Sequence, residues 1–546
     1  MLISIYNYVM KTKQIIIIAL SVIWIRNVVA NNHQRAPLYW SAYEYSFEAS
    51  GNNMDGGAIP ENIWKENIDW VARNLQPYGY NIICIDGWGD DFSYNENGYR
   101  TKHASGRGES GAVNWEHDYA WWSEYIQSKG MSLGIYNNPL WINRQAANCR
   151  IKGREDLTVG SLINENENSI WFTWVQVDRP GAEEYVKNYV QYYADIGVKY
   201  LRVDFLSWFE DGKDKLASLS SNINRPRSHY QTALRWIKEA CNKNNMILSL
   251  VMPHLYNDAE SEILSAPNSL IRINEDVCDG GWYRLSEINR GQSYSIWSKY
   301  HNMFDGFIYW SKLSDKMILD GDFTRLNTFA NEDEKMTAIS LQLIAGGPIA
   351  VADQYNSIGD NLRFYTNEEL LQLNKENFIG KPLSNDPHNV NSQIWKGRLS
   401  NGDWIVGMFN RENQTTVRTF DLKKELGFSN GKVRDLWQFK NIGIKNSLNE
   451  EINPHGCKIF RISPTTTQIS TYVENNIECI SLHGNKVQIK GINDYELEIF
   501  NSQGQTIIHE KNLQNLSIIH LKDNDTFLIA NIKNGEQEFR KKILLK

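Results

Sequence analysis

The strongest chemical candidates in the chain are an arginine and an aspartate in the stretch GVKYLRVDFLSW. Tyr, Leu, Val and Phe favour a β-strand there, and Arg202 and Asp204 stand two residues apart, so both side chains point to the same face of that strand. A nucleophilic carboxylate must be ionised, and a neighbouring cation favours ionisation. The pattern therefore predicts an attacking carboxylate at Asp204. The alternative from spacing alone is a structural ion pair with Arg202 or a cap on the following loop.

The segment RINEDVCDGGW contains three carboxyl groups that could act together with Asp204, namely Glu275, Asp276 and Asp279. Alternation from Arg272 places Asp276 on the same face as that arginine and Glu275 on the opposite face. Asp279 lies beyond the strand, where it can simply begin the Asp-Gly-Gly turn. Two carboxylates from different strands at one pocket are the minimum for cleaving a glycosidic bond, because one attacks the anomeric carbon while the other donates and then removes a proton. We predict Asp276 as the second carboxylate.

Other polar or aromatic residues stand at the ends of apolar runs, where they can meet a sugar. Asp86 can accept hydrogen bonds from two sugar hydroxyls, although an aspartate there can also cap the next loop. Flat aromatic rings stack on sugar faces, but they serve equally well in core packing. The candidates are Trp40, Asp86, Trp88, Tyr136, Arg202, Arg272 and Trp282, with Asn137, Lys312 and Asp353 at further strand ends.

These residues need a scaffold that brings strand ends together, and the pattern between Pro37 and Gln354 predicts one. The apolar runs there are PLYWSAY, YNIICID, MSLGIYN, YLRVDF, MILSLVM, LIRINED, FIYWSKL and PIAVAD. They alternate with helical stretches such as ENIWKENIDWVARNLQ, HDYAWWSEYIQSKG, GAEEYVKNYVQYYADIG and EDEKMTAISLQLIAGG. Eightfold alternation is what a (β/α)₈ TIM barrel requires, and the carboxyl ends of its strands line one pocket. A doubly wound sheet is the competing fold, but no G-x-G-x-x-G follows the first strand.

The sequence pattern changes after the predicted barrel. Short strands separated by Asn-Gly and Pro turns predict an antiparallel β-sandwich, and a polar linker with a further set of strands predicts a small β-sandwich module at the carboxyl end. The predicted domains are therefore 36–375 for the catalytic barrel, 376–464 for the β-sandwich, and 465–546 for the linker and the small β module, which is of a sorting or attachment type.

Residues 1–30 have the pattern of a signal peptide. Lys11 and Lys13 form a basic start, an apolar run follows, and the small residues ending at Ala30 suit cleavage. The apolar run is too short to span a bilayer comfortably, so no transmembrane helix is expected after cleavage. We predict a bacterial protein that is secreted, periplasmic or on the cell surface.

Composition narrows the class of function. The chain has 546 residues and a formal net charge of -7, and no dense Lys/Arg stripe is present, which argues against a nucleic-acid partner. The 19 Trp and 27 Tyr suit a carbohydrate cleft or a large core. No C-x-x-C or HEXXH pattern is present, and we expect neither a metal nor an organic cofactor. The six cysteines lie far apart, so buried free thiols are the default expectation.

Residues 37–464 resemble the family 27 glycoside hydrolases of clan D, the α-galactosidase and α-N-acetylgalactosaminidase family. Five motifs carry the resemblance in order along the chain: YGYNIICIDGW, SKGMSLGIY, ADIGVKYLRVDF, IRINEDVCDGGW and MTAISLQLIAGGPIAVADQ. The last module, with LEIFNSQGQ and NIKNGEQEFRKKILLK, resembles the C-terminal sorting domain of type IX secretion, which implies the secretion machinery as a partner.

The family resemblance implies a retaining double displacement on a carbohydrate substrate. It places Asp204 at the nucleophile and Asp276 at the acid/base, and it implies no cofactor. The positions that it assigns to sugar contacts are Trp40, Asp86, Tyr136, Arg202 and Arg272.

The chain departs from the family pattern around the sugar. Gly87 replaces the second aspartate of the family's Asp-Asp pair, Arg202 replaces a lysine, and Val251 with Met252 stand where α-galactosidases place a glutamate. The glycone therefore stays open between α-galactose, N-acetyl-α-galactosamine, β-L-arabinopyranose or a fucose-type sugar, and isomaltose released from an α-1,6-glucan. A non-catalytic carbohydrate-binding protein on a hydrolase barrel is the rival class, and an anchored structural surface protein is a weaker third.

Overall fold

A computed structural model describes most of the chain from residue 34 onward. The described ranges are 34–49, 59–86, 93–105, 113–167, 173–211, 225–277, 280–465, 478–482, 486–490, 493–501, 505–514, 517–521, 527–534 and 537–544. The predicted signal peptide, Trp88 and Asp279 lie outside them. The chain divides into two compact units, Met1–Ser463 and Pro464–Lys546, which are described separately.

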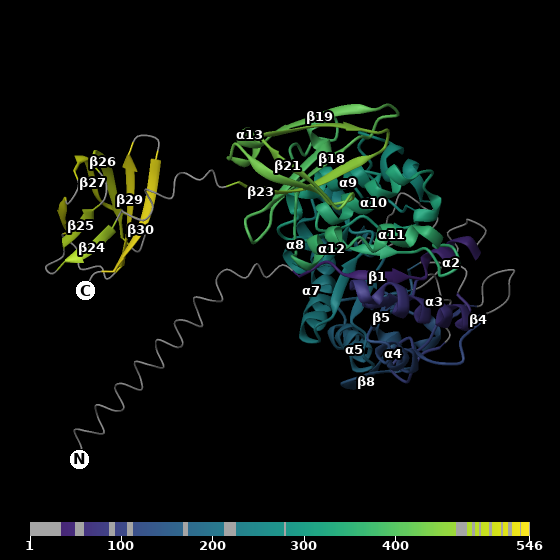
Figure 1. The fold of residues 1–546 in the computed structure, drawn as a ribbon. Coiled ribbons are helices and arrows are strands. Elements are labelled where there is room, and N and C mark those ends of the chain that lie inside the picture. Colours follow the sequence, from purple (N-terminus) through teal and green to yellow (C-terminus); the bar gives the residue numbers. More distant parts are fainter. Residues whose placement is uncertain are drawn as a thin grey trace, which may run out of the picture. The chain divides into compact units, whose positions relative to one another are not determined.

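The first unit contains a sheet of parallel strands that forms the predicted (β/α)₈ barrel (Figure 1). In spatial order its strands are β13 (Ile318–Asp320), β12 (Leu270–Arg272), β11 (Ile247–Leu250), β10 (Tyr200–Val203), β5 (Ser132–Tyr136), β2 (Ile82–Cys84), β1 (Leu38–Ser41), β15 (Ile349–Val351) and β14 (Phe323–Thr324). Seven of the eight predicted apolar runs fall on these strands.

The seventh barrel strand is divided into β13 and β14. β13 pairs with β12 and β14 pairs with β15, so the two residues between them, Gly321 and Asp322, close the ring. A Cβ atom on Gly321 would lie 2.6 Å from the Phe307 ring and 2.9 Å from Met303, which explains the glycine. The closure places polar residues of this strand beside those of its neighbours on both sides.

The prediction of a strand at FIYWSKL, residues 307–313, is wrong. This run forms the end of α9 (Met303–Trp310) and a following 3₁₀ turn (Ser311–Leu313). Asn302 caps the helix, since its side chain accepts a hydrogen bond from the backbone N–H of Asp305 at 2.8 Å. Six of the first seven helix residues are hydrophobic or glycine and α9 is buried almost all round, so it lacks the polar stripe that distinguishes a surface helix from a strand.

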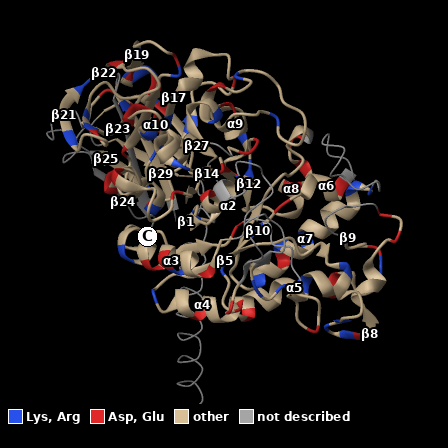
Figure 2. Ribbon diagram, turned by 90° about the vertical axis from the view of Figure 1, so that its right-hand side faces the viewer, with Lys and Arg blue, Asp and Glu red and all other residues tan. Residues whose placement is uncertain are grey.

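Helices surround the barrel, and the four predicted helical stretches are confirmed as α3, α4, α5 and α10. The bounds are α2 (Tyr43–Ala49), α3 (Glu61–Asn74), α4 (Tyr119–Gln127), α5 (Ala182–Asp195), α6 (Leu206–Asp211), α7 (Arg227–Lys243), α8 (Glu260–Ser265), α10 (Glu332–Ile344), α11 (Leu362–Tyr365) and α12 (Glu368–Lys375). Lys and Arg residues are interspersed with Asp and Glu residues along these helices (Figure 2).

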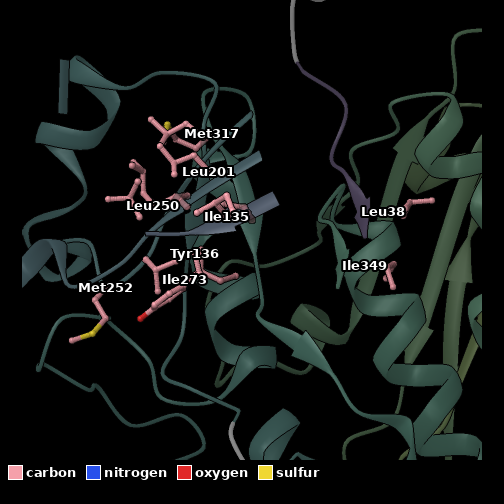
Figure 3. Close-up of a cluster of buried hydrophobic side chains, with 14 of the residues drawn as sticks. Leu38, Ile135, Tyr136, Leu201, Leu250, Met252, Ile273, Met317 and Ile349 are labelled. Carbon is pink, nitrogen blue, oxygen red and sulfur yellow. The ribbon is translucent and has the colours of Figure 1, made fainter. Parts of the chain in front are cut away.

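Two hydrophobic clusters alternate along the barrel strands. Leu38, Ile135, Leu201, Leu250 and Ile349 belong to the cluster that the strands share with the helices (Figure 3). A separate cluster inside the barrel takes the alternate positions, including Tyr39, Cys84, Tyr200, Leu270 and Ile318. Because side chains alternate across a strand, Arg202 and Asp204 follow Tyr200 to the inside.

An antiparallel β-sandwich completes the first unit. Its strands are β16 (Lys381–Pro382), β17 (Ile394–Arg398), β18 (Trp404–Phe409), β20 (Gly431–Asp435), β21 (Lys440–Lys445) and β23 (Cys457–Pro464) in one sheet, and β19 (Thr416–Asp421) with β22 (Ser447–Ile452) in the other. The short helix α13 (Leu422–Leu426) follows β19. Met408, Phe420 and Phe460 lie in the core between the sheets.

The second unit is a small β-sandwich, as predicted. One sheet contains β24 (Glu478–Leu482), β25 (Lys486–Lys490) and β28 (Ile518–His520), and the other contains β26 (Tyr495–Phe500), β27 (Thr506–Leu513), β29 (Phe527–Asn534) and β30 (Gln537–Leu544). Ile489, Leu497 and Ile532 are fully buried between them. Within the described ranges of the whole chain, no helix has the length and apolar character needed to cross a membrane.

A buried ion pair joins the β-sandwich to the barrel. Arg411 and Asp305 are both fully buried, with Arg411 Nη1 2.6 Å from Asp305 Oδ1, and Arg411 also donates to the backbone carbonyl of Ser286 at 2.5 Å. We expect Arg411→Met to lower the free energy of unfolding by about 3–5 kcal/mol, because it leaves Asp305 as an uncompensated buried charge. Urea denaturation followed by tryptophan fluorescence measures the change.

The matched control for this prediction is Arg144→Met. Arg144 Nη1 lies 3.5 Å from Glu165 Oε2, and both side chains are largely exposed, so the loss should stay below about 1 kcal/mol. Equal effects of the two substitutions would contradict the role of Arg411.

Candidate active site

Asp204 follows β10 directly and its carboxylate is held by two donors. The backbone N–H of Phe205 donates to Oδ1 at 2.6 Å and the Tyr136 hydroxyl donates to Oδ2 at 2.9 Å. Phe205 has a φ of 62°, and Asn138 donates to the backbone carbonyl of Asp204 at 2.7 Å, so the turn after the strand is fixed as well. The carboxylate is therefore held in one orientation at the carboxyl end of the barrel strands.

Burial raises the pKa of Asp204 from 3.8 to about 6. The Arg202 guanidinium opposes this rise, and the Asp276 carboxylate adds to it by charge repulsion. The donors at Phe205 and Tyr136 lower the pKa again. The predicted effect of Arg202 on Asp204 has the expected sign, but the desolvation of the carboxylate outweighs it.

Arg202 is almost completely buried and faces three other carboxylates. Its Nε lies 3.6 Å from Asp86 Oδ2, its Nη1 lies 3.6 Å from Asp320 Oδ2, and its Nη2 lies 3.3 Å from Asp322 Oδ1. The recorded ion pairs of Arg202 are thus with these carboxylates, so the alternative of a plain Arg202–Asp204 ion pair is not what the structure shows.

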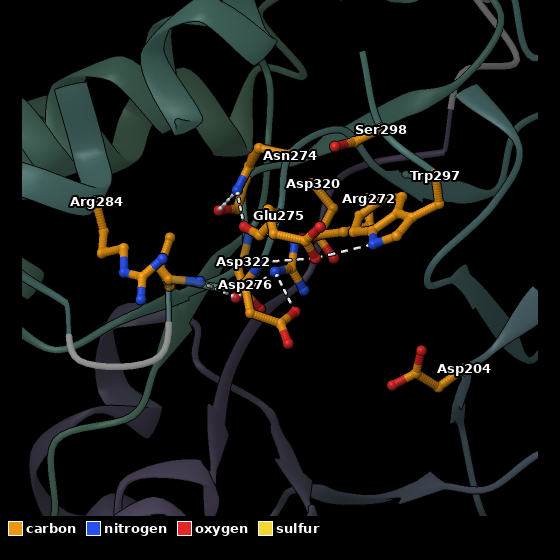
Figure 4. Close-up of polar contacts among 12 residues, drawn as sticks. Asp204, Arg272, Asn274, Glu275, Asp276, Arg284, Trp297, Ser298, Asp320 and Asp322 are labelled. Carbon is orange, nitrogen blue, oxygen red and sulfur yellow. Dashed lines mark hydrogen bonds and ion pairs between the residues drawn. The ribbon is translucent and has the colours of Figure 1, made fainter. Parts of the chain in front are cut away.

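Asp276 lies near Asp204 and is bound by an arginine. Arg272 Nη2 donates to Asp276 Oδ1 at 2.9 Å, while 32% of the Asp276 side chain is exposed (Figure 4). Glu275 turns elsewhere, because its Oε1 accepts from the indole N–H of Trp297 at 2.8 Å, and burial raises the pKa of Glu275 to about 7. Of the two candidate acids that the structure describes in this segment, Asp276 is the one that shares the Arg272 face and interacts with Asp204.

Asp320 and Asp322 are parts of the site that the sequence analysis missed. Asp322 is buried between the two arginines, with Oδ2 2.5 Å from Arg272 Nη2, and the same oxygen accepts from the backbone N–H of Val277 at 3.0 Å. Burial raises its pKa to about 7. Because Asp322 contacts both Arg272 and the residue after Asp276, it positions Asp276. The D-G-D sequence after the apolar run MIL was the available signal, which the misplaced seventh strand concealed.

The prediction that Trp40 contacts sugar is not supported by its position. Trp40 lies in the layer between β1 and α3, where it has no exposed surface, packs 5.9 Å from the Trp64 ring, and donates to the Asp353 carbonyl at 2.9 Å. The strand alternation turns Tyr39 inward and Trp40 outward. Tyr43 is the half-buried aromatic residue against the inner cluster, and its ring stacks on Phe323 with centroids 4.4 Å apart.

The predicted sugar contact at Trp282 also takes another role. Trp282 is only 6% exposed, and its ring stacks on His455 of the β-sandwich with centroids 4.2 Å apart and an angle of 12° between the planes. One face of the indole is thus covered by an imidazole, and little of the ring is left exposed to meet a sugar. Trp282 packs the barrel against the β-sandwich.

Two further predicted strand ends lie away from the catalytic pair. Asp353 anchors the loop after β14, since its carboxylate accepts from the backbone N–H of Leu326 at 2.9 Å and of Asn327 at 3.1 Å. Lys312 belongs to the helical segment described above and lies over the Tyr309 ring at 4.0 Å. Neither residue contacts Asp204 or Asp276.

The strand end between those of Asp204 and Asp276 is apolar, since β11 pairs with β10 on one side and with β12 on the other. Val251 is 1% exposed and Met252 is 9% exposed, so the two residues after β11 are buried hydrocarbon at the place where the resemblance implies a glutamate in α-galactosidases. Asp86 is 5% exposed and is engaged by Arg202. The two candidate carboxylates, Asp204 and Asp276, are therefore surrounded by groups that depart from the pattern that the family resemblance implies for α-galactosidases.

The known proteins most informative for this chain are glycosidases. Residues 389–462 match the model of the alpha galactosidase C-terminal beta sandwich domain. An isomalto-dextranase of Arthrobacter globiformis is 40% identical over 464 residues, which cover 80% of this chain and 69% of that protein. The solved isomalto-dextranase of A. globiformis T6 in complex with panose is 33% identical, covers 94% of this chain and 96% of its own, and superposes with a TM-score of 0.72.

A more distant structure shows the same fold. The GH27 β-L-arabinopyranosidase of Geobacillus stearothermophilus is 21% identical, covers 79% of this chain and 97% of its own, and has a TM-score of 0.61. The fold, the shared β-sandwich and the similarity over most of the isomalto-dextranase agree with one another. The chain belongs to the family 27 glycoside hydrolases, and it is a glycoside hydrolase.

Proposed function

We propose that the protein is a retaining glycosidase that releases isomaltose from α-1,6-linked glucan. The observation that carries the mechanism is the placement of two carboxylates, Asp204 directly after β10 and Asp276 in the segment after β12 bound by Arg272, with the charge of Asp276 raising the pKa of Asp204. Asp204 attacks the anomeric carbon and forms a glycosyl-enzyme intermediate. Asp276, which is partly exposed, protonates the leaving oxygen and then removes a proton from the incoming water.

The choice of glycone rests on similarity and on the altered sugar-binding groups. Identity to the isomalto-dextranase is 40%, against 20% to an α-galactosidase of Aspergillus niger. Val251 and Met252 supply no carboxylate or amide for a sugar hydroxyl, so these two positions cannot make the polar contact that the resemblance implies for an α-galactosidase.

Product analysis tests this function. Dextran, p-nitrophenyl α-galactoside, p-nitrophenyl β-L-arabinopyranoside and p-nitrophenyl N-acetyl-α-galactosaminide are each incubated with the enzyme, and the sugars are separated by anion-exchange chromatography. We expect isomaltose from dextran and little release from the other three substrates. Galactose release without any isomaltose would overturn the proposed substrate. Proton NMR during the first turnovers should show the α-anomer, as retention requires.

The pKa of Asp204 leads to a prediction for the pH profile. Because the attacking carboxylate must be ionised and its pKa is raised to about 6, kcat/KM should fall about tenfold for each pH unit below 6. Tyr136→Phe removes a hydrogen bond that stabilises the ionised form and should shift this acid limb to higher pH. Tyr283→Phe, at an exposed tyrosine, is the control. An acid limb that stays below pH 4.5 would contradict the assignment.

We also propose that the protein is exported. The basic, apolar and small residues of the first thirty positions support cleavage near Ala30, and the carboxyl-terminal module resembles a sorting domain. Amino-terminal sequencing of the mature protein should start close to Asn31. A mature protein that retains the segment would contradict export by this route.

A further inference from the structure

A cleft lies between the barrel and the β-sandwich, and its lining does not include Asp204 or Asp276. It has a volume of about 680 Å³, within the range of small-molecule sites. Its walls come from α10, from α11 and the residues after it, from the turn between β20 and β21, and from the segment around the β22–β23 turn. Figure 1 shows β18 of the β-sandwich beside α10 of the barrel.

Part of the cleft wall lies on the side of the barrel where the strands end. Barrel helices begin at the carboxyl ends of the strands, and the cleft is lined by Glu332 and Asp333 in the first turn of α10. His455, in the β22–β23 turn, contacts Glu334 of that turn at 2.8 Å and also stacks on Trp282, which follows β12. A polymer bound in the active site can therefore extend over this edge.

An aromatic platform forms one wall of the cleft. The Phe439 side chain is 52% exposed to solvent although it is apolar. Its φ of 52° lies in the left-handed region, which bulky residues rarely adopt. Trp437 is anchored by its indole N–H, which donates to Ser340 Oγ at 2.8 Å, and its ring lies 6.0 Å from the Phe364 ring. Exposure and backbone strain at the same aromatic residue indicate a binding role.

The turn that presents Phe439 is internally braced. The Asp435 carboxylate accepts from the backbone N–H of Trp437 at 2.9 Å and of Gln438 at 3.0 Å. The turn therefore holds the aromatic ring without help from a ligand, which lowers the entropy cost of binding.

The polar groups of the cleft suit a neutral ligand with many hydroxyls. The lining contains four acidic residues, Glu332, Asp333, Asp435 and Glu451, against two basic ones, Arg363 and Lys458. This balance disfavours a phosphate or another anion. Asn453 Nδ2 donates to Asp333 Oδ2 at 3.1 Å at the edge of this lining. Carboxylate and amide groups of this kind accept hydrogen bonds from sugar hydroxyls, and amides also donate to them.

We propose that this cleft is an accessory binding site for a neutral glucan chain, with Phe439 as the surface on which a pyranose ring stacks. The choice of glucan rests on the proposed function. The site holds a segment of the polymer whose end is being cleaved, so it raises the affinity for long chains and leaves short substrates unaffected.

Binding and kinetics of the full chain test the proposal. In native gels that contain dextran, the Asp204→Asn protein should be retarded, and adding Phe439→Ala should weaken this retardation by about 3- to 10-fold. In the otherwise wild-type enzyme, Phe439→Ala should raise KM for dextran by a similar factor while kcat and KM for panose stay unchanged. Phe439→Trp keeps the platform and should retain both properties.

Ile444→Ala is the matched control, since Ile444 is 61% exposed on neighbouring β21 and does not line the cleft. Equal retardation of the Phe439→Ala and parent proteins overturns the accessory site, as does an equal loss on panose and dextran. Failure of the proposed function appears separately, as absence of isomaltose from the wild-type enzyme.

Discussion

Asp204→Ala should lower kcat on dextran by at least about 10⁴-fold, because without the carboxylate no glycosyl-enzyme intermediate can form. The substitution removes only the carboxyl group of Asp204. The two groups that donate hydrogen bonds to it, the backbone N–H of Phe205 and the Tyr136 hydroxyl, are unchanged. Initial rates of reducing-sugar release measure the loss. Asp315→Ala, at an exposed aspartate of the same barrel, should keep normal activity.

Azide provides a second readout for the same variant. Azide is small enough to enter the space left by the Asp204 carboxyl group and attack the anomeric carbon from that side. A single displacement inverts the configuration, so the product should be the β-glycosyl azide. Full activity of Asp204→Ala, or an azide product of retained configuration, would contradict its role as nucleophile.

The second large effect is expected at Asp276. Asp276→Ala should reduce dextran hydrolysis by about 10²- to 10⁴-fold, the usual contribution of general acid–base catalysis. A 2,4-dinitrophenyl glycoside needs no proton to leave, so formation of the intermediate should stay fast and its hydrolysis should become rate-limiting. A burst of dinitrophenol in stopped-flow absorbance measures this change. Azide should then rescue turnover with retained configuration, the opposite of the result at Asp204.

Glu275→Gln is the matched control for Asp276. Glu275 is the adjacent carboxyl group, but it accepts a hydrogen bond from Trp297 and does not share the Arg272 contact of Asp276. We expect a much smaller loss and no azide rescue. A larger loss at Glu275 than at Asp276 would exchange the two assignments.

Local pattern predicted much of the scaffold and of the catalytic pair. Alternation along a strand is a property of two or three neighbouring residues, so the shared face of Arg202 and Asp204 could be derived from GVKYLRVDFLSW alone. The same holds for the shared face of Arg272 and Asp276, and for the helices α3, α4, α5 and α10, whose apolar period is regular.

Long-range pairing was needed for the rest of the site. Asp322 meets Arg202 across 120 residues and Arg272 across 50, and nothing in the spacing of either arginine indicates that partner. Trp40 lies in the first strand and Tyr43 begins the helix that follows it, and only the closed barrel decides that Trp40 faces the helices and Tyr43 lies against the inner cluster.

The sequence by itself predicted a (β/α)₈ barrel with two candidate aspartates at the ends of different strands, because residue type and strand period are local properties. The tertiary structure decided which groups surround them. It showed that Arg202 and Arg272 are shared among buried carboxylates, and that burial raises the pKa of Asp204 to about 6. Desolvation and charge coupling depend on every neighbour in space, and the chain brings most of those neighbours together only when the barrel closes.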